Sequence, residues 1–238
     1  MDIKKLEQFL LENNLPKFRL GQIQKAIFAD GVSSFSEITT LSKELRESME
    51  KELKLLLLYI GTRKYAARDR AILACTYFGG MRIGECAALR IKDVLNADGT
   101  IKFEINLHSE QTKGKYGRTV VLSEKLRKEL MDYLLTKYTE KELMALAYSD
   151  LINKPLFTTQ KSEGFSANTL TYTMCMLYKN AGFYGCSSHS GRRSYATKIS
   201  QSVPMRTLME LLGHRDIQTT ARYCLVTSDM KRAAVELV

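Results

Sequence analysis

Helical periodicity runs through most of this chain and is interrupted once, by a short stretch with the two-residue alternation of a β-strand. Apolar side chains at Ile101, Phe103, Ile105 and Leu107 alternate with polar ones, which is typical of a half-buried strand. A glycine-rich turn follows, and residues 119–122 have the composition of the return strand. The pattern is helical again from residue 123 onward. The sequence therefore predicts a mainly α fold with a small antiparallel β-sheet.

The chain is long enough for two units of unequal size. Residues 1–62 carry the apolar periodicity of three short helices, and Ser42 is a plausible N-cap for the third. The stretch Gly61-Thr62-Arg63-Lys64 has the composition of a linker. We therefore expect a small helical module at 1–62 and a larger domain at 63–238.

The charge of the chain is distributed unevenly between these two units. The whole sequence has 36 Lys and Arg against 26 Asp and Glu, a net charge of +10. Residues 1–62 contain nine basic and nine acidic side chains, so all of the excess lies in residues 63–238. A basic domain indicates a polyanionic partner, most often nucleic acid, although mildly basic proteins without such a partner are also common.

Membrane and secreted proteins are not the expected classes. The longest apolar run, Leu55–Ile60, is too short to span a bilayer, and the first residues mix charges without the apolar segment of a secretory signal. Five scattered cysteines do not form a disulfide framework. We expect reduced thiols in a cytoplasmic protein.

Four polar side chains stand at positions that could carry chemistry. His189 lies at the start of an expected helix, His214 follows a glycine, Tyr223 comes nine residues later, and Arg82 follows Gly-Gly-Met. Taken singly, such residues are more often helix caps, surface charges or packing groups than catalytic groups.

Together these residues match the motifs of a known family. Residues 65–94 (YAARDRAILACTYFGGMRIGECAALRIKDV) resemble the first conserved box of the tyrosine recombinases, residues 189–199 (HSGRRSYATKI) resemble the H-x-x-R box, and residues 211–223 (LLGHRDIQTTARY) resemble the nucleophile box. The hairpin turn with Lys113 and the strand after it resembles the turn of the catalytic lysine. The resemblance covers residues 63–238, is closest to the Xer and phage-integrase branch, and implies a tyrosine-recombinase catalytic domain.

This resemblance implies a transesterification at a DNA phosphodiester. Tyr223 attacks phosphorus and forms a 3′-phosphotyrosyl link, with its proton passing to or being oriented by His189. Arg82 and Arg192 bind the non-bridging oxygens, and His214 donates a further hydrogen bond to the phosphate.

Lys113 completes the implied catalytic set by protonating the leaving 5′ oxygen. No carboxylate cluster accompanies the boxes, so neither a metal ion nor another cofactor is expected. ATP is not needed because the phosphotyrosyl link conserves the energy of the cleaved bond. The implied partner is double-stranded DNA at specific recombination sites.

Some positions stay open or depart from the family pattern. Lys115 could be the acid instead of Lys113. Glu85 either supports the site from behind or forms a surface salt bridge. Gly191 stands where the family commonly has Leu, and Arg193 stands where it commonly has His, which makes Arg193 a second candidate for a phosphate contact.

The N-terminal module resembles a different family. Residues 15–49 (LPKFRLGQIQKAIFADGVSSFSEITTLSKELRESM) are similar to the N-terminal helical module of bacterial radical-SAM rRNA adenine methyltransferases. The cysteine motif of those enzymes is absent, so their activity does not carry over. The module is either a nucleic-acid-binding or docking piece, or a stabilising helical cap.

Two other functions fit parts of the pattern. A catalytically silent DNA-binding protein could keep the fold, but the complete set of motif residues argues against it. A type IB topoisomerase would share the chemistry. A short helix expected at residues 227–238 favours a recombinase, because it could dock on a neighbouring copy in a tetramer on paired DNA sites; the alternative is packing on its own domain.

Overall fold

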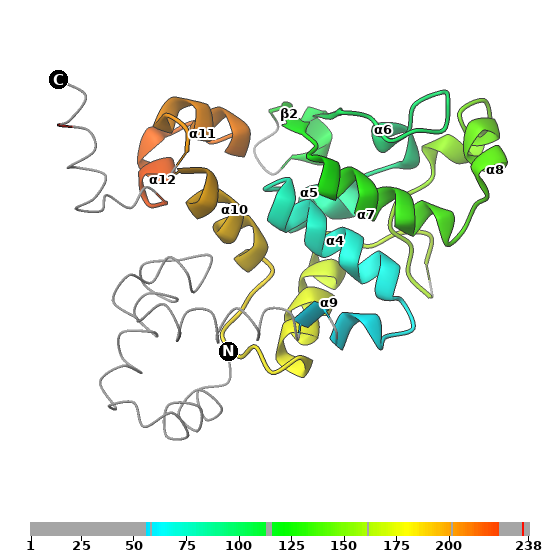
Figure 1. The fold of residues 1–238 in the computed structure, drawn as a ribbon, viewed down its shortest axis with the longest axis horizontal. Helices are drawn as coiled ribbons and strands as arrows, with labels where there is room; N and C mark the ends of the chain where they lie inside the picture. The colour runs from blue at the N-terminus through cyan, green and yellow to red at the C-terminus, as the bar shows by residue number, and fades with distance from the viewer. Residues whose placement is uncertain are drawn as a thin grey trace.

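The computed structural model describes residues 56–57, 59–112, 116–160, 162–200, 202–223 and 235 (Figure 1). The three helices predicted for the N-terminal module lie outside these residues, and so does the helix predicted at 227–238 except for Val235. So do Lys113 and Lys115. Among the described residues, no helix combines the length and the apolar composition that crossing a bilayer requires.

The described part of the chain is mostly helical and contains a two-stranded antiparallel sheet, which confirms the predicted fold class. Its elements are, in order, α4 (Ala66–Phe78), α5 (Ile83–Ala88), α6 (Ile91–Val94), β1 (Glu104–Leu107), η3 (Ser109–Gln111), β2 (Arg118–Val121), α7 (Glu124–Leu135), α8 (Glu140–Leu146), η4 (Asp150–Asn153), α9 (Ala167–Asn180), α10 (Ser190–Ser200), α11 (Met205–Leu212) and α12 (Ile217–Ala221).

The hairpin pairs β1 with β2 so that Ile105 lies opposite Val120 and Leu107 opposite Arg118. Ile105, Leu107 and Val120 are buried, as the alternation predicts. The prediction for Phe103 is wrong: its side chain is 67% exposed. The strand begins only at Glu104, so Phe103 does not share the inward face, and its ring instead lies beneath a guanidinium.

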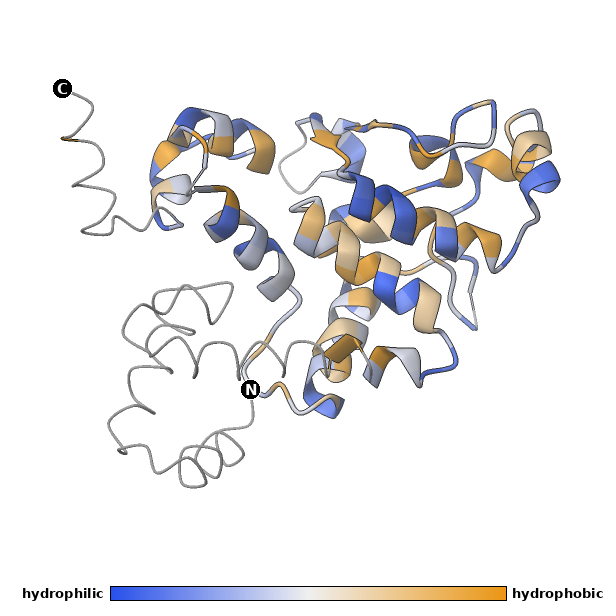
Figure 2. Ribbon diagram, viewed as in Figure 1, coloured by the Kyte–Doolittle hydropathy of each residue, from blue (hydrophilic) through white to orange (hydrophobic). Residues whose placement is uncertain are grey.

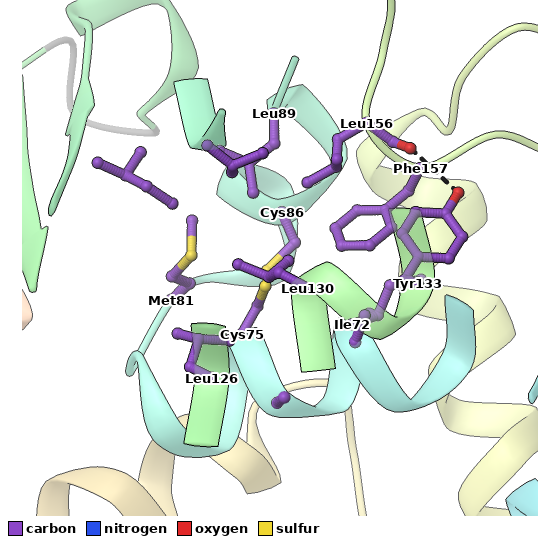
Figure 3. Packing of buried hydrophobic residues seen from close by; sticks show 14 of the residues in the cluster. Ile72, Cys75, Met81, Cys86, Leu89, Leu126, Leu130, Tyr133, Leu156 and Phe157 are labelled. Atoms are coloured by element: carbon purple, nitrogen blue, oxygen red, sulfur yellow. Dashed lines mark hydrogen bonds between the residues drawn. The ribbon is translucent and has the colours of Figure 1, made fainter. Parts of the chain in front are cut away.

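The main core lies where α4 packs against α7 (Figure 3). Ile72 and Cys75 of α4 meet Leu126 and Leu130 of α7, and all four are fully buried. Figure 2 shows hydrophobic residues recurring among polar ones along both helices. This pattern is expected when one face of each helix packs against the core. This packing fixes the end of α4, from which the chain turns toward Arg82 within the first motif box.

Two residues ahead of α4 belong to this core as well. Leu56 and Ile60 are buried within the main cluster. Both precede the linker expected at 61–64, so the larger domain draws on residues before position 62 for its packing.

The C-terminal helices form a second, smaller cluster. Ala196 of α10 packs with Leu208 and Leu212 of α11, and Tyr223 lies against them. Helix α10 also packs along α4, and this contact joins the small cluster to the main body (Figure 1). The two motif boxes at the C-terminal end are thereby brought beside the first one.

Candidate active site

Arg82 lies at the N-cap of α5, where the chain is extended. Its backbone amide donates to Glu85 Oε2 at 2.7 Å and its Nη1 donates to Glu85 Oε1 at 2.9 Å. A longer contact of 3.5 Å joins Nη2 to the carbonyl oxygen of Gly213. The side chain is 27% exposed, so it is held in place by these bonds while part of it stays accessible.

Glu85 is buried, with 1% of its side chain exposed, which excludes the surface salt bridge and favours support of the site. Burial opposes ionisation, but hydrogen bonds and charge from Arg118, with the amide of Arg82, outweigh it and hold the pKa of Glu85 below its ordinary value. The carboxylate therefore stays ionised and balances the positive charge around it.

Arg192 occupies the first turns of α10 and is buried. Its Nη1 donates to the carbonyl oxygen of Gly80, and its Nη2 donates to the carbonyl oxygen of Leu212 at 2.6 Å. Burial, and then repulsion from the two neighbouring arginines, lowers the pKa of Arg192 to about 9. The group still carries its charge at neutral pH, in a place where that charge is poorly solvated.

His214 follows Gly213, the C-cap of α11, whose φ of 61° is favoured by glycine. The imidazole Nε2 lies 3.1 Å from Nη2 of Arg192, and Nδ1 lies 3.0 Å from Oγ1 of Thr220. A guanidinium only donates, so Nε2 must accept. The ring is then neutral, with its proton on Nδ1 and donated to Thr220.

The electrostatic surroundings agree with a neutral ring. Burial, followed by the positive charges of Arg192 and the two other site arginines, lowers the pKa of His214 to about 4. A phosphate entering beside it would reverse part of this effect, because a nearby anion favours the protonated imidazolium.

Tyr223 is half-buried beside His214, with the two rings stacked at 6.0 Å between centroids. Its backbone is tied down from two sides: the amide donates to the carbonyl oxygen of Thr220, and the carbonyl oxygen accepts from Ser200 Oγ. The structure thus brings together four residues of the predicted set, namely Arg82, Arg192, His214 and Tyr223.

The other two predicted residues are not part of the contacts above. His189 is exposed and lies immediately before α10, three positions ahead of Arg192. Lys113 and its alternative Lys115 lie outside the described residues; beside them, Thr112 Oγ1 donates to the carbonyl oxygen of Tyr116 across the base of the turn. The roles of His189 and Lys113 in proton transfer stay predictions.

The departure at position 191 has a structural cause. A side chain on Gly191 would begin 2.3 Å from Thr76 Oγ1 on α4. Helix α10 lies too close to α4 for a Leu at this position. Arg193, by contrast, is exposed, and its phosphate contact stays a prediction.

Sequence reasoning missed one cation. Arg118, at the start of β2, has 7% of its side chain exposed and lies between Glu85 and the end of α11. Its place directly after the lysine turn was the only signal in the sequence. We call Arg82, Arg118 and Arg192 the arginine cluster.

Comparisons with known proteins identify two families along the chain. The model of the phage integrase family matches residues 47–229. A second family model, the N-terminal domain of ribosomal RNA large subunit methyltransferases, matches residues 1–55, which confirms the resemblance of the N-terminal module.

Individual relatives are distant. Transposase A from transposon Tn554 of Staphylococcus aureus is 29% identical over 196 residues, which is 79% of this chain and 50% of that protein. The crystal structure of XerA recombinase has a TM-score of 0.59 and 22% identity, over 99% of this chain and 82% of that chain. The XerH site-specific recombinase bound to its difH substrate, in a pre-cleavage complex, has a TM-score of 0.55 and 25% identity, over 78% of this chain and 52% of that chain.

The chain spans about half the length of the Tn554 transposase. The family model nevertheless matches well over half of the chain, and the motif boxes that carry the resemblance meet at one site. The chain therefore belongs to the phage integrase family of tyrosine recombinases.

Proposed function

We propose that this protein cleaves and rejoins DNA strands at specific sites through a 3′-phosphotyrosyl intermediate, with Tyr223 as the nucleophile. The observation that supports this most is the grouping of Arg82 and Arg192 around His214, whose ring stacks on that of Tyr223. Two fixed positive charges and an imidazole are the groups that a phosphodiester needs when charge develops on its oxygens.

The proposed roles of Arg82, Arg192 and His214 rest on their geometry, and those of His189 and Lys113 rest on the family resemblance. Arg82, partly exposed, binds the non-bridging oxygens directly, and Arg192 supports the same phosphate from a buried position. His214 releases its bond from Arg192 and donates Nε2–H to the phosphate once that anion has raised its pKa. His189 receives or orients the proton of Tyr223, and Lys113 protonates the leaving oxygen.

Double-stranded DNA is the proposed substrate. The net charge of +10 lies wholly in residues 63–238, and the XerH site-specific recombinase was solved bound to its difH substrate. We further propose that copies assemble as a tetramer on paired sites through residues 227–238. The two domains are proposed as a helical module at 1–62 and the catalytic domain at 63–238, with Leu56 and Ile60 contributing to the catalytic domain's core.

The test is covalent capture. Duplexes that bind the wild-type protein are first selected from a random pool, and the recovered sequence, here called the selected duplex, is nicked at successive positions. Wild type should form a denaturation-resistant adduct at one nick position, and Tyr223→Phe should bind equally well without forming it. Tyr172→Phe, at an exposed tyrosine of α9, is the matched control and should form the adduct as wild type does.

The alternatives predict different results from the same material. A silent DNA-binding protein would bind the selected duplex and form no adduct at any nick. A topoisomerase would relax supercoiled DNA without joining two separate duplexes, whereas a recombinase exchanges their strands. An adduct that persists in Tyr223→Phe would remove Tyr223 from the role and direct attention to Cys224, the next residue in the chain.

A further inference from the structure

We propose that Arg118 is a positioning residue that sets the place of His214 and Arg82 for the reaction proposed above. It is a third guanidinium at the site, and protein acceptors occupy most of its donors. Nε and Nη2 donate to the two oxygens of Glu85 at 3.2 Å and 2.7 Å, in the paired geometry of an Arg–carboxylate fork. Nη1 donates to the carbonyl oxygen of Leu211 at 2.7 Å.

These bonds leave Arg118 little capacity for a ligand. A guanidinium has five N–H groups, and a fourth, longer contact of 3.4 Å runs from Nη2 to the carbonyl oxygen of Gly80. The side chain is 7% exposed, compared with 27% for Arg82. Arg118 therefore connects parts of the site through its hydrogen bonds, whereas Arg82 is exposed enough to contact the phosphate directly.

Through Glu85, Arg118 holds Arg82 in position. Glu85 accepts both from Arg118 and from the backbone and side chain of Arg82, so the carboxylate stands between two arginines. If Arg118 no longer fixed this carboxylate, Arg82 would lose the acceptor that orients its guanidinium.

Through Leu211, Arg118 also holds the turn that carries His214. Leu211 lies in the last turn of α11, two residues before Gly213, and its carbonyl oxygen accepts from Arg118. A Cβ on Gly213 would lie 2.4 Å from Cδ of Arg118, so the stem of Arg118 lies directly beside this turn. Arg118 thus connects the first motif box to the nucleophile box.

Arginine is needed here because a lysine cannot reproduce these contacts. An ammonium is a point donor and cannot make two parallel bonds to Glu85 while reaching Leu211. Arg118→Lys keeps the charge and removes the geometry, which makes it the informative variant. Arg70→Lys is the matched control, because Arg70 also forms a fork with a carboxylate, that of Glu129, but between α4 and α7.

The first measurement needs no DNA. The chain has three histidines, so ¹⁵N spectra of the free protein resolve the His214 ring. Wild type and Arg70→Lys should show the neutral ring with its proton on Nδ1. Arg118→Lys should show a mixture with the Nε2–H tautomer, because the loosened turn no longer holds Nε2 against Arg192. An unchanged His214 spectrum in Arg118→Lys would overturn the proposal.

The second measurement uses the selected duplex, nicked at the cleavage position. At saturating duplex, Arg118→Lys should form the adduct about 10- to 100-fold more slowly, the usual range for loss of a supporting contact. Its dissociation constant should change less than about twofold. Arg70→Lys should match wild type in both. A normal adduct rate in Arg118→Lys, or a loss confined to binding, would contradict the positioning role.

A double substitution separates positioning from general loss of structure. In a His214→Gln background, Arg118→Lys should slow the adduct less than it does alone, because part of its effect passes through His214. Full multiplication of the two effects would show that Arg118 acts elsewhere. If wild type itself forms no adduct, the proposed function fails, while the His214 spectra still decide whether Arg118 holds the turn.

Discussion

At the scale of single residues, the charged groups of the site determine one another's protonation. Glu85 keeps its charge because Arg118 and Arg82 surround it, and His214 gives up its charge because burial and the arginine cluster oppose it. Arg118 and Arg192 contribute to both effects, because a positive charge favours an ionised carboxylate and opposes a protonated imidazole. A phosphate that enters this cluster finds positive charge already fixed in place, which is the arrangement that stabilises a charged transition state at low reorganisation cost.

The lowered pKa of His214 predicts how the free protein responds to acid. The folded-state pKa of about 4 lies below the unfolded value of 6.5, so the unfolded chain takes up this proton first as the pH falls. The stabilisation is complete above about pH 6.5 and is lost progressively toward pH 4. Arg192, Arg82, Arg118 and Tyr223 are the titratable groups around the ring.

Thermal melts between pH 7 and pH 4 test this prediction. The melting temperature of His214→Gln should fall less over this range than that of wild type, because glutamine does not take up a proton. His108→Gln is the control, since His108 lies at the start of η3 and outside the arginine cluster, and it should behave as wild type. Equal acid sensitivity in His214→Gln and wild type would place the His214 pKa near its ordinary value.

At the scale of elements, the contact between α10 and α4 determines where Arg192 lies. Gly191→Leu should destabilise the protein, because the new side chain would overlap Thr76 and push α10 away from α4. The free energy of unfolding should fall by about 1–3 kcal/mol, the usual cost of overpacking. Urea unfolding measures this, and adduct formation should slow as Arg192 moves.

The paired substitution identifies the cause. Thr76→Ala removes the hydroxyl oxygen nearest to the added Cβ, so Gly191→Ala should be tolerated better in that background than alone. If Gly191→Leu is as stable as wild type, α10 can shift without cost, and the close approach is not what selects glycine.

The elements that were predictable from sequence are those defined by local pattern. The hairpin follows from alternation around a glycine-rich turn, and the helices from apolar periodicity. Phe103 was predicted wrongly because the pattern does not show where a strand begins. Arg118 escaped prediction because its acceptors lie on two segments that are distant in the sequence, residues 80–85 and Leu211, which only the fold brings together. The motif boxes predicted Arg82, Arg192, His214 and Tyr223, because a match to the motifs of a family can be made without knowing the local structure.

At the scale of the whole molecule, the distribution of charge and the packing of the core indicate different boundaries between the two proposed domains. The charge is neutral through residue 62, but Leu56 and Ile60 are buried in the core of the larger domain. A truncation that tests the N-terminal module must therefore keep these residues. Removing residues 1–50 takes away seven basic and eight acidic side chains and keeps Leu56 and Ile60.

This truncation should change the salt dependence of DNA binding little. Each phosphate contact contributes about −0.9 to the slope of log K against log salt, so a nearly neutral segment should account for no more than about one or two contacts. Binding to the selected duplex, titrated between about 50 and 200 mM salt, gives the slope for the full chain and for residues 51–238, with circular dichroism confirming that both are folded. A folded truncation whose slope falls toward zero would instead make residues 1–50 the main DNA clamp, with their seven basic side chains gathered on one face.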